Sequence, residues 1–205
     1  MKFAIKLTVM TAIILMPFSA VSDSPVTSTH FHTAYANVEM VKKAKAAGII
    51  DTEIAKYLSS PAYGIDYKAA VVNAIGWSIE GKSNAVLYRN QLEKIYARKD
   101  KKFNEDILTP DEIFCLGYLT LLDDYFHPEK AIPLLKKAKK LNPKSFTVAI
   151  ILALAQAQES MNSDWCDVWK ITDKVFTDPE LVRDMRTEAI EIIFNYMALY
   201  RDECD

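Results

Sequence analysis

The chain has 205 residues, which is long enough for one domain with a sizeable core. Its 25 basic and 27 acidic side chains give a net charge of −2, and this mild acidic balance argues against nucleic acid or an anionic membrane surface as the partner. Only 5 glycines occur, and the alternating apolar and polar runs typical of strands are nearly absent. The composition therefore predicts an all-α protein.

The first residues have the pattern of a secretory signal. Two lysines precede an apolar run over 7–18, and a run of this length is too short to span a bilayer. Ser22 and Ala20 place small side chains one and three residues before a cut after Ser22. We therefore expect a signal peptide over 1–22 and a periplasmic or secreted protein that is not inserted in a membrane after cleavage. Residues 23–36 are small, polar and unpatterned, which favours a flexible linker.

The remaining chain, 37–205, has the helical signals of a single domain. The clearest helix start is TPDE at 109–112, where Thr can cap the helix, Pro occupies its first position and Glu can reach back to the cap. Short connections between successive helices predict antiparallel neighbours. The expected helices cover 37–46, 52–58, 66–81, 84–99, 110–124, 128–143, 145–160, 164–176 and 179–204.

Two of these helices share a tetrapeptide pattern. AIGW at 74–77 and CLGY at 115–118 each place a glycine between an aliphatic and an aromatic residue. A glycine inside a helix costs about 1 kcal/mol relative to alanine, so we interpret Gly76 and Gly117 as points where the following helix packs closely. Their spacing corresponds to a period near 40 residues made of helix pairs, which is typical of an α-solenoid.

The segment PEKAIPLLKKAKKLNP at 128–143 resembles the second helix and turn of a tetratricopeptide repeat. Ala131, Leu135 and Ala138 have the small, large, small spacing of that family, and Pro143 stands at its turn. The resemblance implies antiparallel helix hairpins stacked as a short α-solenoid, with units longer than usual as in the related Sel-type repeats; an irregular helical bundle is the alternative. The implied units are 66–100, 109–143 and 145–178, followed by a long capping helix over 179–204.

By this resemblance, the first helices of successive pairs line a concave groove that binds a peptide or protein partner. The implied partner-binding residues are Asn73, Trp77, Glu80, Tyr118 and Gln156. Phe114, Leu121 and Glu159 occupy further groove positions, although the first two are more typical of a core. An envelope adaptor or chaperone and an immunity-type inhibitor of a periplasmic toxin are both compatible with such a module.

Motifs for catalysis are missing from the sequence. It contains no Gly-x-Ser-x-Gly elbow, no glycine-rich phosphate loop and no His-Glu-x-x-His pair. The segment WSIEGKSNAV at 77–86 faintly resembles the end of the catalytic helix of lytic transglycosylases, where Glu80 would be the general acid and would need a raised pKa in an apolar pocket. We predict that the protein is not an enzyme, with peptidoglycan cleavage as a weaker alternative.

No metal or other cofactor is expected. The sequence HFH at 30–32 could offer two metal ligands, but the only other histidine is His127, so we interpret the pair as coincidental.

The three cysteines divide into one buried thiol and one candidate pair. Cys115 lies in the apolar sequence IFCLGY, which favours a buried free thiol. Cys166 begins one expected helix and Cys204 ends the last, so an antiparallel arrangement can bring them together. An unbroken helix over 179–204 would carry Cys204 past its partner, because it would be about twice as long as the helix before it. A disulfide between the two therefore requires a bend or break in the last helix.

Overall fold

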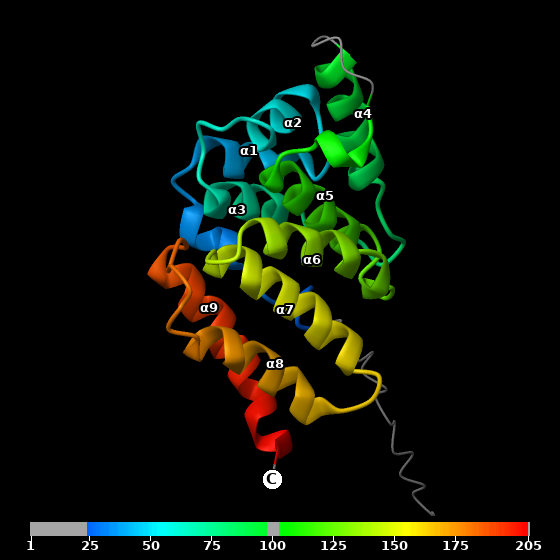
Figure 1. Cartoon of the computed structure of the whole chain (residues 1–205). Helices are drawn as coiled ribbons and strands as arrows, with labels where there is room; N and C mark the ends of the chain where they lie inside the picture. The colour runs from blue at the N-terminus through cyan, green and yellow to red at the C-terminus, as the bar shows by residue number, and fades with distance from the viewer. Residues whose placement is uncertain (1–23, 98–102, 205) are drawn as a thin grey trace, which may run out of the picture.

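The computed structural model describes residues 24–97 and 103–204. The signal peptide expected over 1–22, with its cut after Ser22, lies outside the described residues. Within the described ranges the chain forms helices α1 to α9 and short 3-10 segments, without a strand, so the all-α prediction is confirmed (Figure 1).

The helices follow one another with short connections. The α-helices are α1 (Glu39–Ala47), α2 (Thr52–Leu58), α3 (Ile65–Ile75), α4 (Asn84–Ala97), α5 (Pro110–Asp123), α6 (Ile132–Leu141), α7 (Phe146–Ser160), α8 (Trp165–Thr177) and α9 (Thr187–Met197). The 3-10 segments are η1 (Phe31–Tyr35), η2 (Glu105–Ile107), η3 (Pro128–Lys130) and η4 (Ala198–Cys204). None of these helices has the length and apolar character needed to cross a bilayer.

Several helices begin where the sequence places a capping side chain. At α5 the hydroxyl of Thr109 accepts from the backbone N–H of Glu112, whose carboxylate accepts from the backbone N–H of Thr109, and the capping box is complete. Asp51 caps α2 by accepting from the backbone N–H of Ile54. The first helix departs from expectation because it begins at Glu39, two residues later than the sequence suggests.

The middle of the chain forms the two expected hairpins, α5 with α6 and α7 with α8 (Figure 1). Gly117 lies where α5 and α6 come closest. A Cβ atom at this position would lie 3.1 Å from side-chain atoms of both Leu134 and Leu135. The interpretation of Gly117 as a close helix contact is therefore confirmed.

The interpretation of Gly76 is wrong, and so is the expected hairpin over 66–100. Helix α3 ends at Ile75, and a Cβ atom on Gly76 would meet no atom within 4 Å. At this helix end Gly76 leaves the helical conformation, with φ of 70° and ψ of −175°, and the ammonium group of Lys82 donates to the carbonyl oxygen of Ile75 at 2.7 Å. Helix α3 packs against α1 and α5, while α4 packs against α5 and α2.

The last helix is also broken, so the continuous capping helix expected over 179–204 is wrong. Residues 178–186 form a turn and bends and lie against the start of α7. There the carbonyl oxygen of Val182 accepts from the backbone N–H of Phe146, and the carboxylate of Asp184 accepts from that of Thr147. These two amides have no partner within α7 itself, and this gives a reason for the break.

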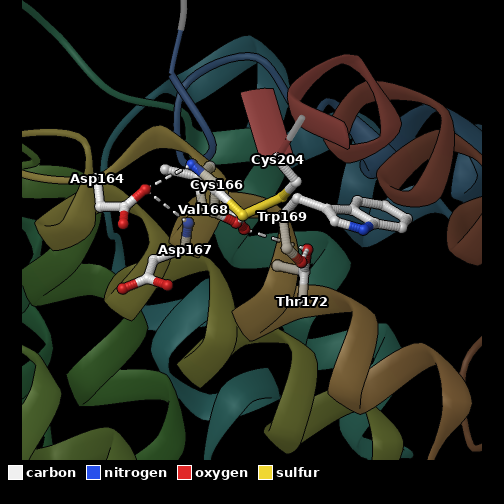
Figure 2. The surroundings of a disulfide bond; sticks show 7 residues. All are labelled: Asp164, Cys166, Asp167, Val168, Trp169, Thr172 and Cys204. Atoms are coloured by element: carbon white, nitrogen blue, oxygen red, sulfur yellow. Dashed lines mark hydrogen bonds between the residues drawn. A yellow bond between two sulfur atoms is a disulfide. The ribbon is translucent and has the colours of Figure 1, made fainter. Parts of the chain in front are cut away.

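The break allows the chain to return to α8. Helix α9 runs into η4, and its end carries Cys204 back to Cys166 at the start of α8, where the two form a disulfide (Figure 2). Asp164 caps the same helix start by accepting from the backbone N–H of Cys166. Cys115 is a buried free thiol in α5.

The segment before α1 is part of the core, so the expectation of a flexible linker over 23–36 is wrong for its described residues. Val26, Phe31 and Tyr35 are almost completely buried. The guanidinium group of Arg186 lies over the ring of Tyr35, 4.4 Å from its centroid, and connects this segment to the start of α9. Turns and a single 3-10 segment bury these side chains without helical or strand periodicity, which is why the sequence pattern does not reveal them. We call residues 24–36 the N-terminal segment.

Candidate functional site

The amide of Asn73 makes all four hydrogen bonds open to it, three to the N-terminal segment and one to Tyr118 of α5. Its Oδ1 accepts from the backbone N–H of His32 at 3.0 Å and from Nδ1 of the same residue at 2.8 Å. Its Nδ2 donates to the carbonyl oxygen of Thr29 at 3.1 Å and to the hydroxyl of Tyr118 at 2.9 Å. Because Asn73 is buried and fully used, its assignment to an open peptide-binding groove is wrong.

Trp77 and Tyr118 contact the same segment. The indole Nε1 of Trp77 donates to the carbonyl oxygen of Thr27 at 3.2 Å, and Trp77 is half-buried. The ring of Tyr118 is buried and stacks on that of Phe31, with 6.5 Å between the ring centroids. The three side chains expected to hold a partner peptide instead hold residues of this chain.

Glu80 and Gln156 lie apart from these residues and from each other. Glu80 is exposed in the loop after α3, and a hydrogen bond from the hydroxyl of Ser78 lowers the pKa of its carboxyl group. A general acid needs the opposite shift, in an apolar pocket. Gln156 is on α7 and lines a cavity of about 330 Å³ together with Ile171 and Lys174 of α8. The structure therefore gives Glu80 no apolar pocket of the kind a general acid requires, and the partner-binding roles of Glu80 and Gln156 stay predictions.

The three further positions expected to line the groove do not lie on one surface either. Phe114 and Leu121 of α5 are fully buried, as their apolar character favours, while Glu159 is exposed near the end of α7. The side chains expected to line one groove are thus distributed among the core, the N-terminal segment and separate surfaces.

A small cavity lies between the N-terminal segment and α3, beside Trp77. Its volume is about 180 Å³. Among the described residues, its lining includes the basic side chains of His30, His32 and Lys45 and no carboxylate. Lys45 is exposed and makes no ion pair with any of the described residues, unlike Lys42 and Lys43 of the same helix. We call this space the His–Lys cavity.

The two ring nitrogens of His32 have different surroundings. Because Nδ2 of Asn73 donates to two acceptors, its Oδ1 must accept, and Nδ1 of His32 therefore carries the ring proton. The other ring nitrogen, Nε2, is buried and has no hydrogen-bond partner among the described residues. Burial lowers the pKa of His32, and the charges of Lys45 and His30 act in the same direction, so the ring is neutral near pH 7.

A second feature is a group of exposed apolar side chains at the connections beside α3. Ile49, Ile79 and Phe126 are 53%, 64% and 57% exposed. Ile49 follows α1, Ile79 lies in the loop between α3 and α4, and Phe126 lies between α5 and η3. We call these three residues the loop patch; Figure 1 places the last two connections at one side of the molecule.

Lys82 and Asp123 hold the connections of the loop patch together. The ammonium group of Lys82 donates to the carbonyl oxygen of Gly48 at 3.0 Å, and its backbone N–H donates to that of Asp123 at 2.9 Å. The carboxylate of Asp123 accepts from the backbone N–H of Ala85 at 2.7 Å. The aromatic ring of Tyr125, next to Phe126, is buried. These contacts give the exposed side chains a fixed backbone.

Sequence reasoning did not find Lys45, Lys82 or the loop patch. A lysine on a helix and isolated apolar residues in loops have no local pattern that separates them from ordinary surface residues. The sequence HFH did single out His32, but as half of a metal pair. In the structure His32 is instead a partner of Asn73, which lies 41 residues away in the chain and sets the tautomer of the imidazole ring.

Comparisons of the chain with protein-family models, with curated proteins and with solved structures find no match. The resemblance to tetratricopeptide repeats therefore rests on the sequence pattern at 128–143 and on the succession of hairpins that contains it.

Proposed function

We propose that this protein is an exported protein–protein interaction module of tetratricopeptide-like hairpins, and that it binds a peptide or protein partner through the loop patch. The groove expected from the sequence is not the proposed site, since Asn73 and Tyr118 already contact the N-terminal segment. The proposal keeps the expected class of function and moves the contact surface to the connections between helices.

The observation that carries this proposal is the exposure of large apolar side chains on a fixed backbone. Exposed apolar residues that occur singly are ordinary, but Ile79 and Phe126 lie on two connections that the backbone hydrogen bond from Lys82 to Asp123 brings together. A preorganised apolar surface loses little conformational entropy on binding, which favours affinity for a complementary partner.

The disulfide between Cys166 and Cys204 supports the exported part of the proposal. Disulfides persist in oxidising compartments and are rare where thiols are kept reduced. The bond is also consistent with the basic and apolar pattern of the first residues, which suggests a secretory signal.

The experiment is a pull-down from periplasmic extract with three purified proteins: wild type, Phe126→Asp and Leu199→Asp. Leu199 is 68% exposed and lies in η4, so its substitution makes the same chemical change on another surface. We expect the same partner with wild type and Leu199→Asp, and loss of at least about nine-tenths of it with Phe126→Asp, because a buried carboxylate without a pair is strongly unfavourable.

Equal recovery with Phe126→Asp and wild type would contradict the loop patch as the contact surface. The affinity of a recovered partner then separates the two kinds of module. One partner with a nanomolar dissociation constant favours an immunity-type inhibitor, and several partners with micromolar constants favour an adaptor or chaperone.

A further inference from the structure

We propose that a cavity at the starts of α1 and α3 binds a proline-rich segment of a partner protein, with a basic residue beside the prolines. The cavity has a volume of about 540 Å³, and its lining includes the rings of Tyr57, Tyr63 and Tyr67. We call it the tyrosine cavity. It is separate from the loop patch, whose residues Ile49 and Ile79 follow the other ends of the same two helices, so each proposal can fail without the other.

The hydroxyl group of Tyr57 is available to a ligand in the tyrosine cavity. Tyr57 is only 8% exposed, and its hydroxyl makes no hydrogen bond with any described residue. The hydroxyl is nevertheless not among the unpaired polar atoms there that are closed off from solvent. The small exposed part of Tyr57 therefore includes its hydroxyl, at the cavity that the residue lines. Burial raises the pKa of Tyr57 to about 12, so the hydroxyl keeps its proton and can donate.

The three tyrosine rings of the cavity are held in place by neighbouring contacts. Tyr63 stacks on Tyr57 with 3.8 Å between the ring centroids, although Tyr63 itself is 42% exposed. Tyr67 makes a T-shaped contact with the buried ring of Tyr35 at 5.6 Å, and its hydroxyl accepts from the guanidinium group of Arg186 at 3.4 Å. Rings fixed in this way lose little conformational entropy when an apolar group packs on them.

The starts of α1 and α3 add backbone donors to the same cavity. Val38 and Gly64 stand at the N-cap positions of these helices, and both residues line the cavity. Neither helix start has a side-chain cap, and the first N–H groups of a helix have no carbonyl partner within it. Together with the hydroxyl of Tyr57, these groups favour a ligand that carries carbonyl oxygens and few N–H groups of its own.

Proline combines the properties that complement this cavity. Its carbonyl oxygen accepts a hydrogen bond as in any residue, while its nitrogen carries no proton that binding would leave unpaired. A run of prolines already has the extended polyproline II conformation, so little entropy is lost when it binds. Grooves lined by aromatic side chains recognise proline-rich segments by packing their rings against the prolines. The volume of the tyrosine cavity also lies within the range of ligand-binding pockets.

Glu39 sets the charge preference of the cavity. It is the one charged side chain among the described residues of the lining, which include no basic one. Its carboxylate is 85% exposed and pairs with Lys42 at 2.6 Å, so it adds orientation more than affinity. A lysine or arginine beside the prolines complements this carboxylate, whereas an acidic residue would be repelled.

The experiment measures binding of labelled synthetic peptides to the purified protein by fluorescence anisotropy. The first peptide has a lysine followed by about six prolines; the second has alanine in place of the prolines, and the third has glutamate in place of the lysine. We expect a micromolar dissociation constant for the first peptide, binding at least about tenfold weaker for the second, and binding about threefold weaker for the third.

Variants of the protein test the assigned groups. Tyr57→Phe removes the unpaired hydroxyl and keeps the stacked ring, so it is expected to weaken binding of the proline peptide about fivefold without loss of folding. Tyr63→Ala removes an exposed ring of the cavity and is expected to weaken binding at least about tenfold. Leu199→Ala, which truncates an exposed apolar side chain in η4, is the control and should leave binding unchanged. Circular dichroism and urea midpoints check that each variant is folded.

Equal binding of the proline and alanine peptides, unchanged binding by Tyr57→Phe, or no binding of the proline peptide at about 1 mM would each overturn the proposal. Tighter binding of tetramethylammonium than of the proline peptide would also overturn it, because the rings and Glu39 would then form a site for organic cations. A pull-down that contradicts the loop patch leaves this measurement unaffected, since the probe here is a peptide of defined sequence.

Discussion

Gly76 and Gly117 share a local sequence pattern but have different structural roles. Gly117 lies inside α5, where a Cβ atom would lie 3.1 Å from side-chain atoms of α6. Gly76 lies just beyond α3 with φ of 70° and ψ of −175°, and a Cβ atom there would be free of neighbours. Position 117 needs glycine because a side chain has no space there, and position 76 needs glycine because its backbone has a positive φ.

The difference arises from what each glycine meets in the fold. The helix that contains Gly117 continues to Asp123 because its apolar residues face neighbouring helices along its whole length. The helix before Gly76 ends where this glycine takes a positive φ, and there Lys82 donates to the carbonyl oxygen of Ile75 and Trp77 donates to that of Thr27. A tetrapeptide pattern therefore predicts a helix only as far as tertiary contacts allow it to continue.

Side-chain size at Gly117 should have the largest effect on stability. We expect Gly117→Leu to lower the free energy of unfolding by at least about 3 kcal/mol and Gly117→Ala to lower it by about 1 kcal/mol, because the larger side chain must displace Leu134 and Leu135. Urea unfolding followed by circular dichroism measures both. A Leu variant no less stable than the Ala variant would show that α6 can move away without loss.

Asn73 tests whether the N-terminal segment is part of the folded core. Asn73→Ala removes four hydrogen bonds and leaves the buried N–H of His32 without an acceptor, so we expect a loss of about 2–3 kcal/mol. Hydrogen exchange should also become faster over 24–36 than in α7. Asn142→Ala, at a partly exposed helix end, is the matched control. It should change the free energy of unfolding by no more than about 0.5 kcal/mol and leave hydrogen exchange over 24–36 unchanged.

Substitutions at Gly76 should show a smaller effect that is independent of size. We expect Gly76→Ala and Gly76→Leu each to lower the free energy of unfolding by about 1–2 kcal/mol, because the strain belongs to the positive φ and not to a steric neighbour. The same urea measurement applies. A cost that grows from Ala to Leu as steeply as at Gly117 would remove the distinction between the two glycines.

The pH dependence of stability should report the buried ring of His32. Burial, with the charges of Lys45 and His30 added, lowers its pKa in the folded state, so the unfolded state binds the proton more strongly. Stability is then full above about pH 6.5 and falls as the pH decreases, by at most about 1.4 kcal/mol per pH unit. Urea midpoints at pH 7.5 and 5.5 should differ less for His32→Gln than for wild type.

The exposed His127 supplies the control for this measurement. His127→Gln should keep the wild-type difference between the two pH values. An unchanged difference in His32→Gln would mean that another group controls the acid sensitivity of the protein.

Local chemistry by itself determined the helical class and most helix starts. Scarce glycine and the capping residues Asp51, Thr109, Ser145 and Asp164 act within a few residues of themselves, so their effect can be predicted from the chain alone. The same applies to the hairpins over 109–143 and 145–178. The candidate pair Cys166 and Cys204 was also identifiable, together with the condition that the last helix must break.

Contacts between distant parts of the chain decided the rest. The N-terminal segment is buried because Asn73, 41 residues further on, binds His32, and the last helix breaks because Asp184 and Val182 supply partners for the start of α7. The same contacts turned the expected binding residues inward and left the His–Lys cavity beside them. Buried polar groups are satisfied by partners that only the folded chain brings to them. This is why the sequence pattern could not reveal the burial of the N-terminal segment or the inward position of Asn73.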